Sequence, residues 1–141
     1  MDERPSVVVI DHDASVRKLL HVHLAIAGYK VLCAQDAIGG GHLVAQASPC
    51  LVVCDANLPY MNGYEFVSAL RSDPLTREIP VILLTIKGET HHDAQRLGIV
   101  ASLKKPVRPE RLLELVGGIG SAAAWPRGAH RIAKTSARAA S

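Results

Sequence analysis

The chain has 141 residues, which is enough for one compact domain and too few for two of ordinary size. Hydrophobic residues make up 48% and charged residues 21%, a globular composition, and the apolar runs are too short to span a bilayer. The formal charge of +3 is uneven, because the first 116 residues carry 12 Lys/Arg and 13 Asp/Glu, whereas the remainder carries four basic residues and no acid. So small a basic tail does not make a nucleic-acid-binding domain, and no nucleic-acid partner is expected.

The amino end and the cysteines favour a cytoplasmic protein. Residues 1–5 form a short arm that lacks the basic start and long apolar stretch of a signal peptide. Cys33, Cys50 and Cys54 are an odd set without C-x-x-C spacing. We therefore expect reduced thiols, a cytoplasmic location and no membrane partner.

Short, continuous apolar runs alternate with helical patterns along most of the chain. Such runs predict strands buried on both faces of a parallel sheet, at 7–10, 31–34, 51–54, 81–84 and, more weakly, 100–103. The stretches between them show a 3.6-residue apolar period, with Gly28 ending the first helix and Pro109 opening the last. Thr90 and Asp93 resemble a capping box for a short helix before Gly98. Five β-α units predict a doubly wound α/β domain with a five-stranded parallel sheet and helices on both faces.

The helical pattern is weakest in two places. The helix predicted over 36–47 contains Gly39-Gly40-Gly41, and each glycine costs up to about 1 kcal/mol relative to alanine. No Gly-x-Gly-x-x-Gly pattern or P-loop lysine accompanies them, which favours a locally soft helix over a phosphate-binding loop. Residues 119–141 are rich in Ala, Gly, Ser and Arg and are predicted to form a disordered basic tail.

Polar residues follow the predicted strands, at the edge where ligands bind in doubly wound sheets. Asp11 follows the first strand, Asp55 the third, Thr85 the fourth and Lys105 the fifth. Two carboxylates this close raise each other's pKa unless a cation lies between them, and oxygen ligands suit Mg²⁺. A hydroxyl and an ammonium beside a metal-bound carboxylate indicate a site that stabilises phosphoryl oxygens.

Four segments, VVVIDHD, LVVCDANLPYMNGYEF, IPVILLT and LKKP, resemble in order and spacing the receiver domain of two-component response regulators. The most specific part is the run in which Asp55 is followed by a proline four residues later and a glycine eight residues later. We assign residues 6–118 to this domain. The resemblance implies a flavodoxin-like sheet with strand order 2-1-3-4-5.

The resemblance also implies a metal-dependent phosphoacceptor. Asp55 is expected to take a phosphoryl group from a histidine kinase or a phosphotransfer protein, forming an aspartyl phosphate. Asp11 and Asp55, with the backbone carbonyl of Asn57, are expected to hold Mg²⁺.

Further roles follow for the last two strands. Lys105 is expected to pair with the phosphoryl group, and the peptide bond between Lys105 and Pro106 to be cis. The Thr85 hydroxyl is expected to bind the phosphoryl group and to shift the population of an output surface.

Three positions depart from the family's pattern. His12 stands where a second acidic metal ligand is usual. Imidazole suits Zn²⁺, Ni²⁺ or Cu²⁺ better than Mg²⁺. We therefore expect weakened Mg²⁺ binding and treat His12 as an atypical ligand. Asp13 is predicted to cap the first helix instead of replacing that ligand. Ile86 replaces a small residue and is expected to narrow access to Asp55. Ser102 replaces the usual switch aromatic, so the coupled threonine–aromatic movement is not expected.

We therefore predict a non-enzymatic receiver without an attached output domain, which signals by protein contacts. Its target is expected at the surface of the fourth helix, fifth strand and fifth helix, and a homodimer is left open. The basic residues of that surface predict an acidic partner; they are His91, His92, Arg96, Lys104, Arg108 and Arg111.

Two alternatives remain. One is a pseudo-receiver that binds partners without being phosphorylated. The other is a haloacid-dehalogenase-type phosphatase with Asp11 as nucleophile and Asp13 as general acid, because Asp-x-Asp also follows the first strand of those enzymes.

Overall fold

The computed structural model describes residues 3–87 and 92–120. Its strands are β1 (Ser6–Ile10), β2 (Lys30–Ala34), β3 (Leu51–Asp55), β4 (Val81–Thr85) and β5 (Ile99–Lys104). Its helices are α1 (Ala14–Ile26), α2 (Ala37–Ala47), α3 (Gly63–Ser72), α4 (His92–Arg96) and α5 (Pro109–Gly120). Each predicted strand is present and is one or two residues longer than its apolar run.

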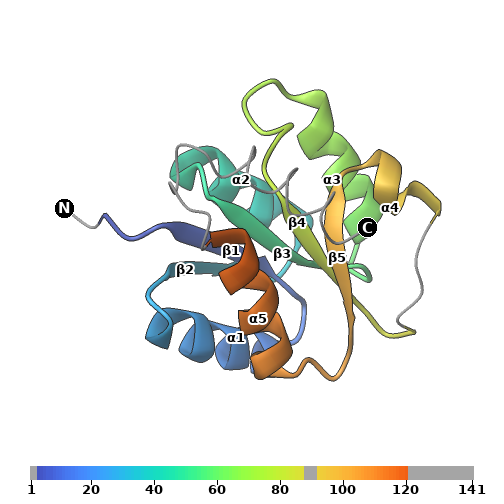
Figure 1. Cartoon of the computed structure of the whole chain (residues 1–141). Coiled ribbons are helices and arrows are strands. Elements are labelled where there is room, and N and C mark those ends of the chain that lie inside the picture. The colour runs from blue at the N-terminus through green and yellow to red at the C-terminus, as the bar shows by residue number, and fades with distance from the viewer. Residues whose placement is uncertain (1–2, 88–91, 121–141) are drawn as a thin grey trace.

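The strands form one parallel sheet in the order β2-β1-β3-β4-β5, which confirms the predicted fold and strand order. Every residue of the central strands β3 and β4 is buried, as the continuous apolar runs indicated. Because all five strands run in the same direction, their carboxyl ends lie at one edge of the sheet (Figure 1). The polar residues that follow the strands are therefore gathered there.

Helices cover both faces of the sheet, with α1 and α5 on one face and α2 and α3 on the other (Figure 1). Alternate residues of β1 enter the two hydrophobic cores: Val7 and Val9 pack with α1 and α5, whereas Val8 and Ile10 pack with α2 and α3. Both faces of β1 are therefore packed against helices, and this packing fixes the position of the residues that directly follow the strand.

The α2 helix continues through its three glycines. Asp36 caps it, with Oδ1 accepting a hydrogen bond from the Gly39 amide at 2.8 Å. At Gly40 a Cβ atom would lie 2.4 Å from Ile10 Cδ1, so the helix packs directly against the β1 side chain. Close packing on the sheet thus offsets the cost of glycine at this position.

The ends of α1 follow the sequence-based expectation. Asp13 is the N-cap residue, and its Oδ1 accepts hydrogen bonds from the backbone and the hydroxyl of Ser15. These hydrogen bonds, the hydroxyl first, lower the pKa of Asp13. Gly28, just past the helix, has a φ of 106°, a conformation that favours glycine.

The three cysteines are free thiols, as predicted. Burial raises the pKa of Cys50 to about 12 and raises that of Cys54 further. No helix within residues 3–87 or 92–120 has the length and apolar character that a membrane span requires. The predicted cap at Thr90 and the tail from residue 121 lie outside the described residues.

Candidate functional site

The polar residues that were predicted to follow the strands lie at the carboxyl edge of the sheet, which we call the rim. Asp55 and Thr85 are the last residues of β3 and β4, and Asp11 and Lys105 directly follow β1 and β5. Asp11 and Asp55 are fully buried, although carboxylates are rarely so without a partner. This burial requires compensating positive charge nearby.

Lys105 supplies one such charge. Its Nζ lies 2.9 Å from Asp11 Oδ2 and 3.2 Å from Asp55 Oδ2, so one ammonium bridges both carboxylates. Burial by itself lowers the pKa of Lys105, but the hydrogen bond and charge of Asp11, followed by those of Asp55, outweigh it and raise the pKa. The ammonium therefore stays charged over the physiological range.

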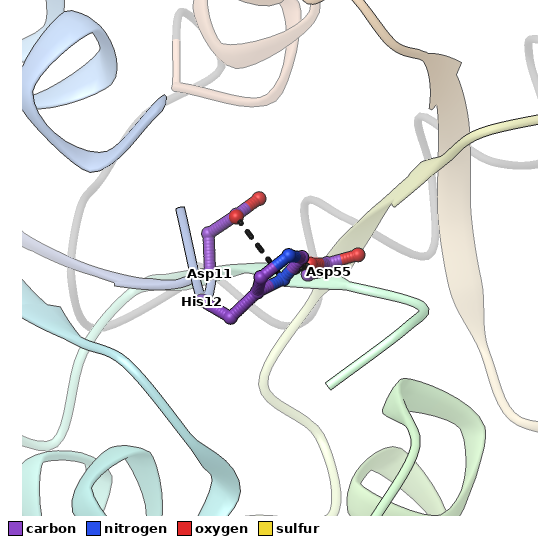
Figure 2. A group of neighbouring side chains, drawn as sticks. All are labelled: Asp11, His12 and Asp55. Atoms are coloured by element: carbon purple, nitrogen blue, oxygen red, sulfur yellow. Dashed lines mark hydrogen bonds and ion pairs between the residues drawn. The ribbon is translucent and has the colours of Figure 1, made fainter. Parts of the chain in front are cut away.

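His12 lies beside the same two carboxylates. Its Nδ1 is 2.8 Å from Asp55 Oδ2, a hydrogen-bonding distance, and 3.8 Å from Asp11 Oδ1. Figure 2 shows the imidazole close against Asp55, with Asp11 beside it. Because 53% of the His12 side chain is exposed, the ring stands between the buried acids and solvent.

Backbone groups fix both carboxylates. The Asn57 amide donates to Asp55 Oδ1 and the Asp13 amide donates to Asp11 Oδ1, each at 2.9 Å. A side chain also fixes the backbone here, because Arg17 Nη1 donates to the Asp11 carbonyl at 2.8 Å. The sequence did not predict this contact, since a single arginine in a helix carries no signal for it. These bonds leave Asp55 Oδ2 facing Lys105 and His12.

Thr85 contributes a buried hydroxyl. The residue is 5% exposed, and its Oγ1 has no hydrogen-bond partner within the described part of the chain. The Lys105 amide donates to the Thr85 carbonyl at 2.7 Å, which ties the loop after β5 to the end of β4. Burial of an unpaired hydroxyl is costly, so the Thr85 hydroxyl is available as a donor to a ligand oxygen at this edge of the sheet.

The remaining predicted positions lie around this cluster. The Lys105–Pro106 peptide bond is cis, as the resemblance implied. Ile86 directly follows β4 and is 59% exposed. Ser102 lies half-buried within β5 and is paired in register with Leu83.

Arg71 is a second residue that the sequence did not single out. From α3 it donates to the carbonyls of Leu97 at 2.6 Å and Ile79 at 2.8 Å, so it joins α3 to the segments that precede β4 and β5. Burial lowers the pKa of its guanidinium. Arg71 therefore stabilises the packing of α3. Its hydrogen bonds within the described residues go to backbone carbonyls and not to the acidic pocket, which is the group formed by Asp11, His12 and Asp55.

The donor set fits Mg²⁺ only in part. Asp11 and Asp55 supply hard carboxylate oxygens, which suit Mg²⁺. The third candidate ligand atom in this group is a nitrogen of His12. One ligand atom from each of the three residues lies within 4.8 Å of the other two. Nitrogen is a poor ligand for Mg²⁺, so the pocket can hold a metal but is not built for that ion alone.

A model of the response regulator receiver domain family matches residues 7–117. The chain therefore belongs to this family of signalling domains. This membership agrees with the sheet order and with the acidic pocket at the edge of the sheet.

Individual relatives agree with this assignment. The chain is 33% identical over 110 residues to the phosphate regulon transcriptional regulatory protein PhoB of Pseudomonas aeruginosa, covering 77% of this chain and 48% of that protein. It is 35% identical over 114 residues to the DNA-binding dual master transcriptional regulator RpaA of Synechocystis, covering 79% and 47%. The chain thus spans about half the length of these curated relatives.

Solved structures show the same fold. The chemotaxis response regulator CheY4 of Vibrio cholerae superposes with a TM-score of 0.74 at 30% identity, covering 80% of this chain and 96% of that one.

Proposed function

We propose that the domain is the phosphoacceptor of a two-component relay, with Asp55 as the acceptor. The observation that carries this proposal is the arrangement of the Asp55 carboxylate. One oxygen, Oδ1, is held by the Asn57 amide, while Oδ2 faces the Lys105 ammonium at 3.2 Å. A carboxylate oriented in this way beside a fixed cation is suited to attack an electrophilic phosphorus atom.

In the proposed reaction an Asp55 oxygen attacks the phosphorus of a phosphohistidine on a histidine kinase or phosphotransfer protein. The new bond joins oxygen and phosphorus, the phosphorus–nitrogen bond breaks, and the departing imidazole retains the electron pair and takes up a proton. Lys105 stabilises the negative charge of the transferred oxygens, and the unpaired Thr85 hydroxyl donates a hydrogen bond to one of them. We propose that Mg²⁺ binds the two carboxylates weakly, because His12 replaces an oxygen ligand.

The test is intact mass after incubation with a small phosphoryl donor and divalent metal. Wild type is expected to gain the mass of one phosphoryl group, and Asp55→Ala and Asp55→Asn are expected to gain none. Phosphorylated kinase or phosphotransfer protein serves as a second donor. Absence of transfer from both donors to the folded wild type would contradict the proposal and favour a pseudo-receiver.

The phosphatase alternative has less support. It requires Asp13 as general acid, but Asp13 is exposed and its carboxylate is engaged in capping α1. Hydrolysis of a small phosphomonoester that survives Asp55→Ala and is lost in Asp11→Asn would favour this alternative.

A basic output surface is proposed on α4, β5 and α5. Arg96, Lys104 and Arg111 are exposed on these elements, and Arg108 is exposed directly before α5, which favours an acidic target. Arg96→Glu with Arg111→Glu is expected to reduce, at low salt, the capture of target protein from lysate by the immobilised domain, by at least tenfold. Lys30→Glu, on the opposite edge strand β2, is the matched control. Equal capture by all three proteins would refute the proposed surface.

A further inference from the structure

We propose that the acidic pocket is a site for a first-row transition-metal dication, of the Co²⁺ and Zn²⁺ class, with His12 Nδ1 as a direct ligand. This inference rests on the proposed function for the role of the metal in phosphoryl transfer. The metal site itself is defined by Asp11, His12 and Asp55.

The two distances from His12 Nδ1 to carboxylate oxygens lie just below and just above the edge lengths of such a coordination shell. Metal bonds of about 2.0–2.2 Å to nitrogen and oxygen place neighbouring ligand atoms about 3.0–3.5 Å apart in octahedral or tetrahedral geometry. His12 Nδ1 lies 2.8 Å from Asp55 Oδ2 and 3.8 Å from Asp11 Oδ1. A metal ion can therefore replace the His12–Asp55 hydrogen bond with small side-chain shifts.

The backbone holds His12 at this position. Residue 11 directly follows β1, and residue 13 caps α1 and donates its amide to Asp11 Oδ1. His12 lies between these two fixed residues, so its imidazole is presented to the carboxylates by the strand-to-helix connection. More than half of the imidazole side chain is exposed, so a dissolved metal ion can reach the ring itself.

Two further observations indicate that a ligand completes the rim. Two fully buried carboxylates share a single ammonium, that of Lys105, and a dication bound between them would add the positive charge that such burial favours. Thr85 Oγ1, at the end of the neighbouring strand, is buried and has no partner among the described residues. A hydrated metal ion would supply oxygen atoms at the edge where that hydroxyl lies.

Ligand chemistry decides which metal is favoured. Mg²⁺ demands near-ideal octahedral oxygen coordination and keeps several waters, whereas imidazole binds Co²⁺, Ni²⁺, Cu²⁺ and Zn²⁺ well. Some preference for these ions exists at any carboxylate site, because divalent affinities follow a general order. The part of the preference that depends on His12 is therefore the quantity to measure.

The experiment titrates the full chain with Co²⁺ followed by visible absorption, and then with Mg²⁺ in competition, without a phosphoryl donor. Wild type is expected to bind Co²⁺ at least 100-fold more tightly than Mg²⁺. His12→Ala should lose at least tenfold in Co²⁺ affinity and shift the absorption bands, because a nitrogen ligand is removed. His12→Asp should gain at least tenfold in Mg²⁺ affinity. His21→Ala, an exposed histidine on α1, is the matched control and should match wild type.

Co²⁺ affinity and spectrum unchanged in His12→Ala, or an equal loss in His21→Ala, would overturn the inference. Failure of the proposed function is separate from this result. A chain that binds Co²⁺ through His12 but takes no phosphoryl group retains the metal site and loses the phosphoacceptor role. A chain that is phosphorylated at Asp55 but whose metal affinity does not depend on His12 retains the phosphoacceptor role and loses the proposed metal site.

Discussion

Gly63→Ala is expected to destabilise the domain by about 3 kcal/mol, because it overpacks a contact between two backbone segments. Gly63 is the first residue of α3, and its amide donates to the Ala56 carbonyl at 2.9 Å. A Cβ atom there would lie 2.5 Å from the Asp55 carbonyl oxygen and 2.8 Å from Ala56 Cα. Backbone atoms cannot rotate away as a side chain can, so either α3 or the end of β3 must move. Urea unfolding of both proteins measures the difference.

Gly41→Ala is the matched control. Gly41 lies inside α2, and the nearest atom to its Cβ would be Phe66 Cε1 at 3.9 Å, an ordinary contact. Alanine there should stabilise the helix by up to about 1 kcal/mol. Gly63→Ala is also expected to reduce phosphoryl incorporation, because it displaces the backbone that carries Asp55. Unfolding free energies within 0.5 kcal/mol of each other for the two variants, on the scale of ordinary surface changes, would contradict the argument.

The strands and the rim residues were predictable because both depend on local pattern. Continuous apolar runs such as 51–54 and 81–84 are typical of strands that are buried on both faces of a parallel sheet. Parallel strands bring their carboxyl ends together, so Asp11, Asp55 and Lys105 had to lie near one another. The spacing from Asp55 to Gly63 also has a physical reason, since the loop between them returns α3 to backbone contact with β3.

The remaining features depend on individual contacts for which the sequence carries no period or spacing. The pairing of His12 Nδ1 with Asp55 joins residues 43 positions apart. Arg17 and Arg71 act through backbone carbonyls, and any residue type can supply a carbonyl. The sequence suggested a soft helix at residues 39–41 because it does not show that Gly40 packs directly against Ile10. That contact arises only when the helix packs on the sheet.

Lys105→Met is expected to lower the free energy of unfolding by about 2 kcal/mol at pH 7. Removing one partner of a buried ion pair leaves uncompensated charge, here on two carboxylates that are 0% exposed. The loss should fall below that of a fully buried pair, because the Lys105 side chain keeps 16% exposure. Lys104→Met, at the adjacent exposed lysine, should change stability by less than about 0.5 kcal/mol.

The pH dependence separates this ion-pair effect from lost packing. The pKa of Lys105 is raised in the folded state, so its contribution is complete below the pKa of an unfolded lysine, about 10.4, and is lost as the pH rises through the higher folded value. The difference between wild type and Lys105→Met should therefore stay constant from pH 7 to about pH 9 and shrink only above about pH 10.4. Urea unfolding across this range measures it. A difference that persists undiminished at the highest pH would mean that the lysine stabilises the domain through its methylene chain, and that the bridge between Asp11 and Asp55 contributes little.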